Sequence, residues 1–254
     1  MFVLLVGLVF SGYKIVDYFY TSYDEKQNFN NVEKLVESEY EDEKIQYNDF
    51  EILKKYKKVY EKNNDLVGWI KIKDTNIDYP VMQTKDDYSY YLKRNFNKKS
   101  SIYGTPFVGD GCGINPNSDN VIIYGHNMKN GTMFGQLKNF SKDDSAYNKS
   151  KYFWIFTPEK TYRYEIISAY TTAVNSDTYT LFKGPGQEFV DYMNKIVSYS
   201  DVKTTPGELG VDDKIVTLST CTGNESTRYV VQGKRVDTLD VVKKSDSTKQ
   251  TGDN

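Results

Sequence analysis

The sequence predicts a mostly β fold, a closed β-barrel or a β-sandwich, rather than a layered α/β fold. About eight short apolar runs are separated by turn residues, and few segments show helical spacing. With 38% hydrophobic and 27% charged residues, the 254-residue chain has enough apolar mass for a folded core. Its length suits one large domain, or one domain with an appendage.

The predicted strands alternate with turns and loops along the chain. They span residues 69–72, 77–83, 102–108, 121–124, 151–156, 162–174, 214–220 and 228–236. Pro80 lies inside the second run and cannot donate a hydrogen bond to a ladder. That strand is therefore expected to be bent or to lie at a sheet edge.

Helical spacing is present at two main places. Asn48 and Glu51 form a pattern like a capping pair, and the apolar residues behind them predict a helix over residues 49–62. After the Gly-Pro-Gly sequence at 184–186, apolar residues recur at helical spacing and predict an amphipathic helix over residues 187–199. Shorter helical stretches are predicted at residues 86–92 and 132–140.

The chain begins with an unbroken apolar run, Met1–Phe10, and Lys14 and Asp17 interrupt the next apolar stretch. Ten residues are too few to cross a bilayer, which takes about 20. A membrane anchor, a signal peptide and a buried helix remain open as interpretations. We favour an anchor over residues 1–23, which would hold the protein in the cell membrane with the rest of the chain on the extracellular face.

Composition divides the remaining chain into three parts. Residues 24–47 are dense in Asp, Glu, Lys and Asn and predict a polar helical spacer. Residues 48–240 hold all the predicted strands and form the main domain. The polar tail, residues 241–254, is predicted to be disordered.

Charge and cysteine content exclude several classes of function. With 33 basic and 35 acidic side chains the formal net charge is −2, so no basic excess points to a nucleic-acid partner. Two cysteines and one histidine fall short of the about four ligands of a zinc site. Neither an EF-hand loop nor a glycine-rich phosphate loop is present. We therefore expect no metal and no cofactor, and any catalysis should depend on a cysteine.

Three residues at predicted strand ends have complementary chemistry. The single histidine, His126, directly follows an apolar strand, Cys221 ends another, and Arg228 opens the next. A cysteine thiolate attacks acyl groups, and an imidazole can donate a proton to a leaving amine. A guanidinium stays protonated and can stabilise an oxyanion. If they converge, the three residues supply nucleophile, acid/base and oxyanion stabiliser.

Structural roles for the same residues remain open. A cysteine at a strand end is often a small buried hydrophobic residue, and a lone histidine is often structural. In an exported protein, Cys112 and Cys221 could also form a disulfide. The glycine-rich loop around Cys112, residues 110–113, instead predicts an exposed thiol. General cysteine and histidine chemistry does not decide between these alternatives.

Local motifs resemble one known family. Residues 217–221, Thr-Leu-Ser-Thr-Cys, resemble the Thr-Leu-x-Thr-Cys signature of sortases, the cell-wall transpeptidases of Gram-positive bacteria. The Tyr-Gly-His-Asn run at 124–127 and the position of Arg228 are also similar, in the same order along the chain. The resemblance covers roughly residues 48–237. Similarity to class B of the family lies in residues 66–70, 77–81, 90–92 and 95–96.

The resemblance implies a closed eight-stranded sortase-type β-barrel with N-terminal helices and a helix between strands six and seven, and it makes residues 48–240 the catalytic domain. Cys221 would attack a Pro-x-Thr sorting motif near the C-terminus of secreted proteins. His126 would protonate the leaving amine and then deprotonate a peptidoglycan cross-bridge amine, while Arg228 would bind the substrate and the oxyanion. The substrate-groove residues that the resemblance implies are Leu92, Tyr179 and Ser219, with Thr220 supporting Cys221.

Two other functions stay open at this point. A secreted cysteine peptidase would form the same thioacyl intermediate and pass the acyl group to water. A non-catalytic surface-binding module would use the cysteine and histidine only as structural residues.

Overall fold

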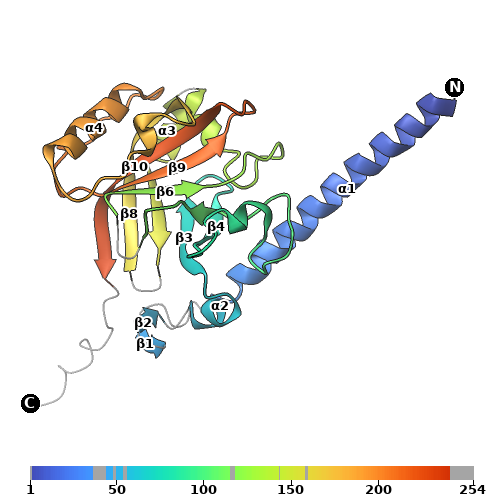
Figure 1. The fold of residues 1–254 in the computed structure, drawn as a ribbon, viewed down its shortest axis with the longest axis horizontal. Helices are drawn as coiled ribbons and strands as arrows, with labels where there is room; N and C mark the ends of the chain where they lie inside the picture. Colours follow the sequence, from blue (N-terminus) through green and yellow to red (C-terminus); the bar gives the residue numbers. More distant parts are fainter. Residues whose placement is uncertain are drawn as a thin grey trace, which may run out of the picture.

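A computed structural model describes residues 2–36, 44–47, 50–53, 56–114, 118–142, 144–157 and 160–240. Its centre is a closed barrel of eight strands (Figure 1). The strands are β3 (Leu66–Ile72), β4 (Asp78–Met82), β5 (Phe107–Val108), β6 (Asn120–Tyr124), β7 (Tyr152–Phe156), β8 (Lys160–Ala173), β9 (Ile215–Cys221) and β10 (Thr227–Asp240). The predicted barrel is therefore confirmed, whereas the tail predicted to be disordered, 241–254, lies outside the described residues.

The barrel has the strand order β10-β8-β7-β3-β4-β5-β6-β9. Most neighbours are antiparallel, but β4 pairs with β5 in parallel at one position and β6 pairs with β9 in parallel along its length. Tyr124 lies opposite Ser219 at the end of the β6–β9 ladder. Both strands are buried along almost their whole length, as expected for parallel strands covered on both faces. Because parallel strands end at the same edge, the residues that follow β6 lie beside the end of β9.

Helices pack around the outside of the barrel. The helix α4 (Gln187–Ser198) connects the sixth barrel strand, β8, to the seventh, β9, which confirms the predicted helix. Its apolar face, with Phe189, Tyr192 and Met193 at helical spacing, packs with Val230 in one buried cluster. The other helical segments are α1 (Phe2–Glu33), α2 (Lys57–Lys62), α3 (Asp144–Lys149), and the 3-10 helices η3 (Tyr90–Lys93), η4 (Leu137–Ser141) and η5 (Asp177–Tyr179).

The helix predicted over residues 49–62 is only half correct. It is helical from Lys57, as α2, whereas the residues before it form the strand β2 (Phe50–Leu53). This strand pairs antiparallel with β1 (Lys44–Tyr47) in a separate two-stranded sheet. Isoleucine, tyrosine and phenylalanine favour strands, and the pairing of these two short segments overrides the helical spacing.

The strand predicted over residues 102–108 is reduced to the two residues of β5. It pairs with β4 at a single position, Met82. Pro80 of β4 lies opposite Trp69 of β3, and among the described residues it has no ladder partner on its other side. A proline fits this strand because its missing N–H is needed by no neighbour there.

The helix α1 runs without a break over Phe2–Glu33 and projects away from the barrel at its N-terminal end (Figure 1). Within the described part of the chain, no helix is both long enough and apolar enough to pass through a lipid bilayer. The predicted membrane anchor over residues 1–23, and with it the predicted location at the extracellular face of the cell membrane, is therefore wrong. The physical reason is that the apolar run ends at Phe10 and that Lys14 and Asp17 interrupt the apolar residues behind it.

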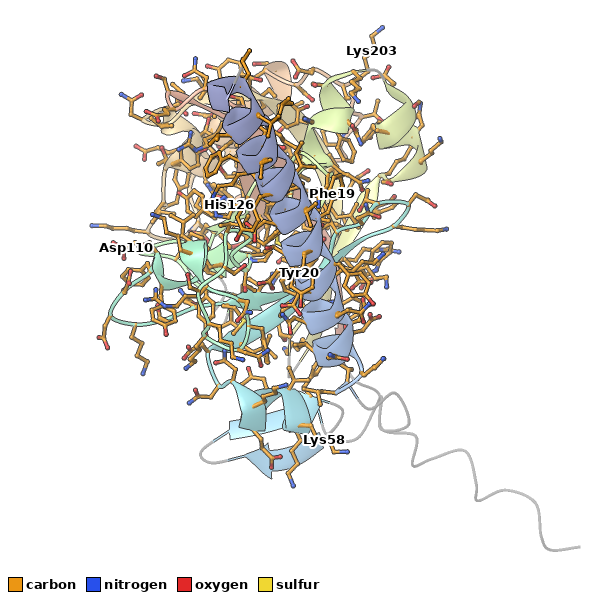
Figure 2. All side chains as sticks on the ribbon, turned by 90° about the vertical axis from the view of Figure 1, so that its right-hand side faces the viewer. Phe19, Tyr20, Lys58, Asp110, His126 and Lys203 are labelled. Carbon is orange, nitrogen blue, oxygen red and sulfur yellow. The ribbon has the colours of Figure 1, made fainter. Side chains whose placement is uncertain are left out.

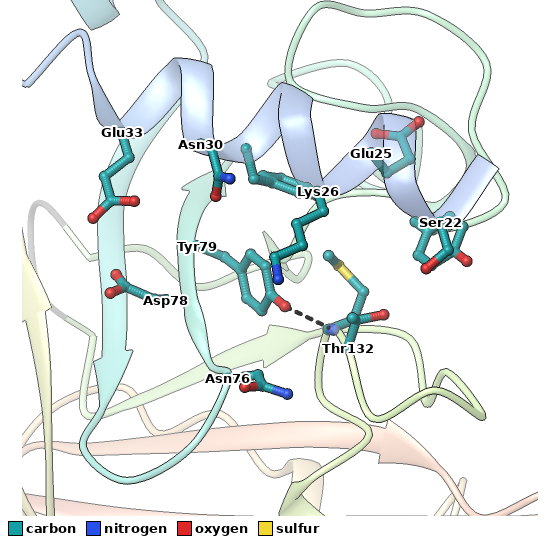
Figure 3. A pocket seen from close by; sticks show the side chains of 12 residues that line it. Ser22, Glu25, Lys26, Asn30, Glu33, Asn76, Asp78, Tyr79 and Thr132 are labelled. Atoms are coloured by element: carbon teal, nitrogen blue, oxygen red, sulfur yellow. Dashed lines mark hydrogen bonds between the residues drawn. The ribbon is translucent and has the colours of Figure 1, made fainter. Parts of the chain in front are cut away.

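The C-terminal half of α1 packs against the barrel. Val32 is 1% exposed and belongs to the same buried cluster as Trp69, and the ring of Phe29 meets the ring of Tyr79 edge-on at 5.1 Å. Figure 3 shows the pocket between this part of α1 and β4, into which Lys26 extends toward Tyr79. The first residues of the predicted spacer are thus part of the folded core.

Candidate active site

The barrel edge at which β6 and β9 both end is held by three hydrogen bonds beyond the last ladder pair. The N–H of Gly125 donates to the carbonyl of Ser219 at 3.1 Å, and the hydroxyl of Thr220 donates to the carbonyl of Gly125 at 2.7 Å. The side-chain amide of Asn127 donates to the carbonyl of Cys221 at 2.7 Å. These bonds join two strand ends that are 95 residues apart in the sequence.

Cys221 is the last residue of β9, and its side chain is exposed. In the antiparallel ladder with β10 it lies directly opposite Arg228. The Nη1 group of Arg228 donates to the backbone carbonyls of Glu225, at 3.0 Å, and Thr227, at 2.8 Å. In the described part of the chain, no hydrogen bond links the thiol to His126 or to Arg228, so the sulfur is open to a substrate.

The ring of His126 is oriented by η3. Its Nε2 lies 2.6 Å from the backbone carbonyl of Leu92. Because a carbonyl can only accept, Nε2 carries the proton, and Nδ1 is the free acceptor of the neutral ring. The preceding residue must be glycine, because a Cβ on Gly125 would lie 2.7 Å from the ring of Phe134.

The loop that follows His126 rests against α1. The side-chain amide of Asn130 donates to the hydroxyl of Ser22 at 2.6 Å. Tyr18 and Phe19 of α1 line a shallow pocket together with Met128 and other residues of this loop. Figure 2 views this side of the molecule, with α1 in front of the barrel and His126 labelled. The helix therefore supports the loop next to the histidine.

Tyr179, in η5, lies against the end of β9. Its hydroxyl is 2.9 Å from that of Ser219, and its ring stacks on Tyr124 with centroids 6.2 Å apart. Burial raises the pKa of the Tyr179 hydroxyl above its ordinary value and raises the pKa of Tyr124 to about 12, so both hydroxyls stay protonated. Arg228 lowers and Cys221 raises the pKa of Tyr179 by smaller amounts, so this hydroxyl lies within electrostatic reach of both.

Cys112 is buried, at 8% exposure, so the predicted exposed thiol is wrong. The loop folds back onto β6, and the sulfur accepts a hydrogen bond from the N–H of Ile122 at 3.4 Å while the thiol donates to the carbonyl of Gly109 at 3.5 Å. Burial raises the pKa of this thiol. Cys112 and Cys221 are both free, so the disulfide alternative is overturned.

The seven residues predicted for the site lie around this edge of the barrel. Two of them, Leu92 and Ser219, were predicted to line a substrate groove with their side chains, but their contacts in the structure are with other residues of the site. Leu92, whose side chain is 38% exposed, bonds to the histidine through its backbone carbonyl. Ser219 is 1% exposed and contacts Tyr179. Among the residues that the structure describes, no three His, Cys, Asp or Glu side chains are arranged to hold a metal ion.

The sequence did not predict Asn127 as a residue of the site. The side chain of Asn127 reaches the backbone of Cys221, 94 residues away in the sequence. The sequence shows that a polar residue directly follows the histidine at a strand end. It does not show that this residue bonds to Cys221, because that contact depends on the pairing of β6 with β9.

The chemistry of this edge is that of acyl transfer. An exposed thiol can attack a carbonyl carbon, an imidazole with one free nitrogen can accept and return a proton, and a guanidinium can stabilise a developing oxyanion. Cys221, His126 and Arg228 carry these groups at neighbouring strand ends.

Comparison with known proteins identifies the family. Residues 70–236 match the family model of the sortase domain. Sortase B of Listeria monocytogenes is 37% identical over 180 residues, which cover 68% of this chain and 71% of that protein. Sortase B of Staphylococcus aureus is 32% identical over 239 residues, which cover 90% of this chain and 91% of that protein.

Solved structures show the same similarity. Sortase B from B. anthracis in complex with AAEK1 has a TM-score of 0.74 at 29% identity, covering 86% of this chain and 99% of that one. Sortase B from Clostridium perfringens has a TM-score of 0.65 at 34% identity, covering 71% and 99%. A Staphylococcus aureus sortase B–substrate complex has a TM-score of 0.74 at 25% identity, covering 87% and 99%. This chain therefore belongs to the sortase family and is a cysteine transpeptidase of the sortase B class.

Proposed function

We propose that this transpeptidase cleaves a Pro-x-Thr sorting motif near the C-terminus of secreted proteins and transfers them to an amine of a peptidoglycan cross-bridge. Cys221 is the nucleophile, His126 the acid/base and Arg228 the oxyanion stabiliser. The observation that supports these roles is the register of the barrel edge, with Cys221 opposite Arg228 where β6 also ends. A related Staphylococcus aureus sortase B has been solved as a substrate complex.

The reaction consists of two acyl transfers. As the sulfur of Cys221 attacks the threonine carbonyl, Nδ1 of His126 takes up the thiol proton, and His126 gives this proton to the leaving amine when the amide C–N bond breaks. The cross-bridge amine then attacks the thioester, His126 takes up the proton of that amine and passes it to the departing sulfur, and the thiol is released. Arg228 stabilises the negative carbonyl oxygen in both steps. One amide bond breaks and one forms, so no oxidant or cofactor is needed.

The remaining predicted residues have supporting roles in this proposal. The carbonyl of Leu92 holds Nε2 of His126, which leaves Nδ1 as the atom that exchanges the proton. Ser219 holds the hydroxyl of Tyr179, whose ring forms one wall of the peptide groove. Thr220 ties the end of β9 to the residue before the histidine.

Mass spectrometry with sorting peptides tests the proposal. Peptides with Asn-Pro-x-Thr and other Pro-x-Thr motifs should give an acyl adduct on Cys221, and an added cross-bridge amine should convert it to the ligated product. The variant Cys221→Ala should give neither, whereas Cys112→Ala, which removes the buried thiol, should behave like the wild type. If hydrolysis dominates whatever amine is offered, the amine-transfer step proposed here is wrong.

A further inference from the structure

The side chain of Asn127 connects the two strand ends that carry the proposed catalytic pair. It directly follows His126, and its Nδ2 group donates to the backbone carbonyl of Cys221 at 2.7 Å. The backbone on the histidine side is fixed separately: Asn127 pairs with Met133 in an isolated bridge, and the N–H of Phe134 donates to the carbonyl of His126 at 2.9 Å. The amide therefore extends from a braced loop to the end of β9.

This bond differs from the other two that join the strand ends. The bonds of Gly125 and Thr220 lie one or more residues before the thiol. Among the described residues, the amide of Asn127 is the side chain of the histidine loop that reaches Cys221 itself. Beyond Cys221 the chain turns into an exposed loop, so β9 has no later contact with β6 that would hold its end.

We propose that Asn127 is a positioning residue for the transpeptidase reaction: its amide fixes the backbone of Cys221 relative to the ring of His126 and so sets the distance over which thiol and imidazole exchange a proton. The inference rests on the roles proposed above for those two residues. Asn127 acts through Cys221 and His126 and does not touch the substrate, because its amide group is bonded to the backbone carbonyl of Cys221. Small displacements matter at this point, since about 1 Å of misplacement can cost about 10²-fold in rate.

The bond requires a donor at this position. An aspartate has nearly the shape of asparagine, but its ionised carboxylate has no N–H to give to a carbonyl. Asn127→Asp therefore breaks the bond with little change in volume, and Asn127→Ala breaks it without adding charge. Because the side chain is only half-buried, both variants should fold with melting temperatures close to that of the wild type.

The decisive measurement is the rate of alkylation of Cys221 by iodoacetamide as a function of pH, followed by peptide mass spectrometry. Both variants should lose about tenfold in rate near neutral pH, because a displaced imidazole no longer takes up the thiol proton efficiently. Cys112 does not interfere, because it is buried and its pKa is raised. Arg228 and Tyr179, which also interact with Cys221, are unchanged in these variants.

Asn194→Ala is the matched control. This exposed asparagine of α4 also donates its amide to a backbone carbonyl, that of Val190 at 3.1 Å, and its loss should leave the alkylation profile unchanged. A wild-type profile in Asn127→Ala and Asn127→Asp would overturn the positioning role. With a sorting peptide that the wild type cleaves, kcat should fall in both variants while KM changes little. If the wild type cleaves no such peptide, the proposed substrate is wrong, and the alkylation profile still decides the role of Asn127.

Discussion

At the scale of single residues, Arg228 is the group whose removal should affect the chemistry most directly. We expect Arg228→Ala to lower kcat/KM for a sorting peptide by about 10²–10³, the usual cost of losing one oxyanion donor. Arg228→Lys should recover only part of this, because an ammonium cannot keep the planar geometry that bonds to two backbone carbonyls. A fluorogenic peptide assay measures both.

The control for this prediction is Arg163→Ala. Arg163 lies on β8 and pairs with Asp237 at 3.5 Å, so its loss should leave the peptide assay unchanged. Activity of Arg228→Ala equal to that of the wild type would remove the arginine from the proposed mechanism.

Residue type and strand-end position identified the three residues proposed for catalysis as candidates, and the resemblance to sortases was needed to favour catalytic over structural roles for them. Residue type and position were not enough for contacts that depend on a backbone partner far along the chain, such as the carbonyl of Leu92 on His126 or that of Cys221 on Asn127. The burial of Cys112 was missed for the same reason, since glycine-rich sequence indicates a turn but not which strand the turn covers.

At the scale of elements, the start of β6 anchors the segment that carries Tyr179. The amide of Asn120 donates to the carbonyl of Thr180 at 3.1 Å, and its oxygen accepts from the hydroxyl of Thr217 at 2.9 Å. The neighbouring residue, Asp119, accepts from the N–H of Gly184 at 2.9 Å. One strand thus holds the segment that carries Tyr179 at one end and leads to His126 at the other.

We therefore expect Asn120→Ala to raise KM for a sorting peptide about tenfold, equivalent to about 1.4 kcal/mol of binding free energy, with little change in kcat. Ser168→Ala is the control, because Ser168 is also fully buried and donates to the side chain of Gln232 at 2.9 Å without contacting η5. Steady-state kinetics compare the two. An equal rise of KM in both variants would show a general loss of stability rather than a local anchor.

Helices and strands were predictable from the sequence where the spacing of apolar residues fits only one type of secondary structure. The helix α4 follows its predicted range closely because one apolar face packs against β8 and β10. The hairpin of β1 and β2 was not predicted, because its short segments fit both a strand and a helical period and the choice depends on their mutual pairing. The strand at β5 was predicted too long, since the chain before it bends at residues 102–103 and Gly104 has a φ of +59°, which a strand does not adopt.

At the scale of the whole molecule, α1 is divided into a packed half and an exposed half. Val32 is 1% exposed and Val9 is 66% exposed on the same helix. We expect Val32→Ala to lower the free energy of unfolding by about 2 kcal/mol, the transfer and cavity cost of the lost methyl groups, and Val9→Ala to leave it nearly unchanged. Thermal unfolding followed by circular dichroism measures both. Equal melting temperatures in the two variants would mean that α1 lies outside the cooperative unit.

The parallel pairing of β6 with β9 also determines when reactivity can first appear. Gly125 and Thr220 are 95 residues apart, and contacts of such sequence separation form late because closing a long loop costs entropy before any contact compensates for it. A partly synthesised chain that ends before β9 lacks Cys221, and one that ends before β10 lacks Arg228. An unfinished chain therefore cannot bring the thiol of Cys221, the imidazole of His126 and the guanidinium of Arg228 together, and the complete site exists only after the last barrel strand has formed.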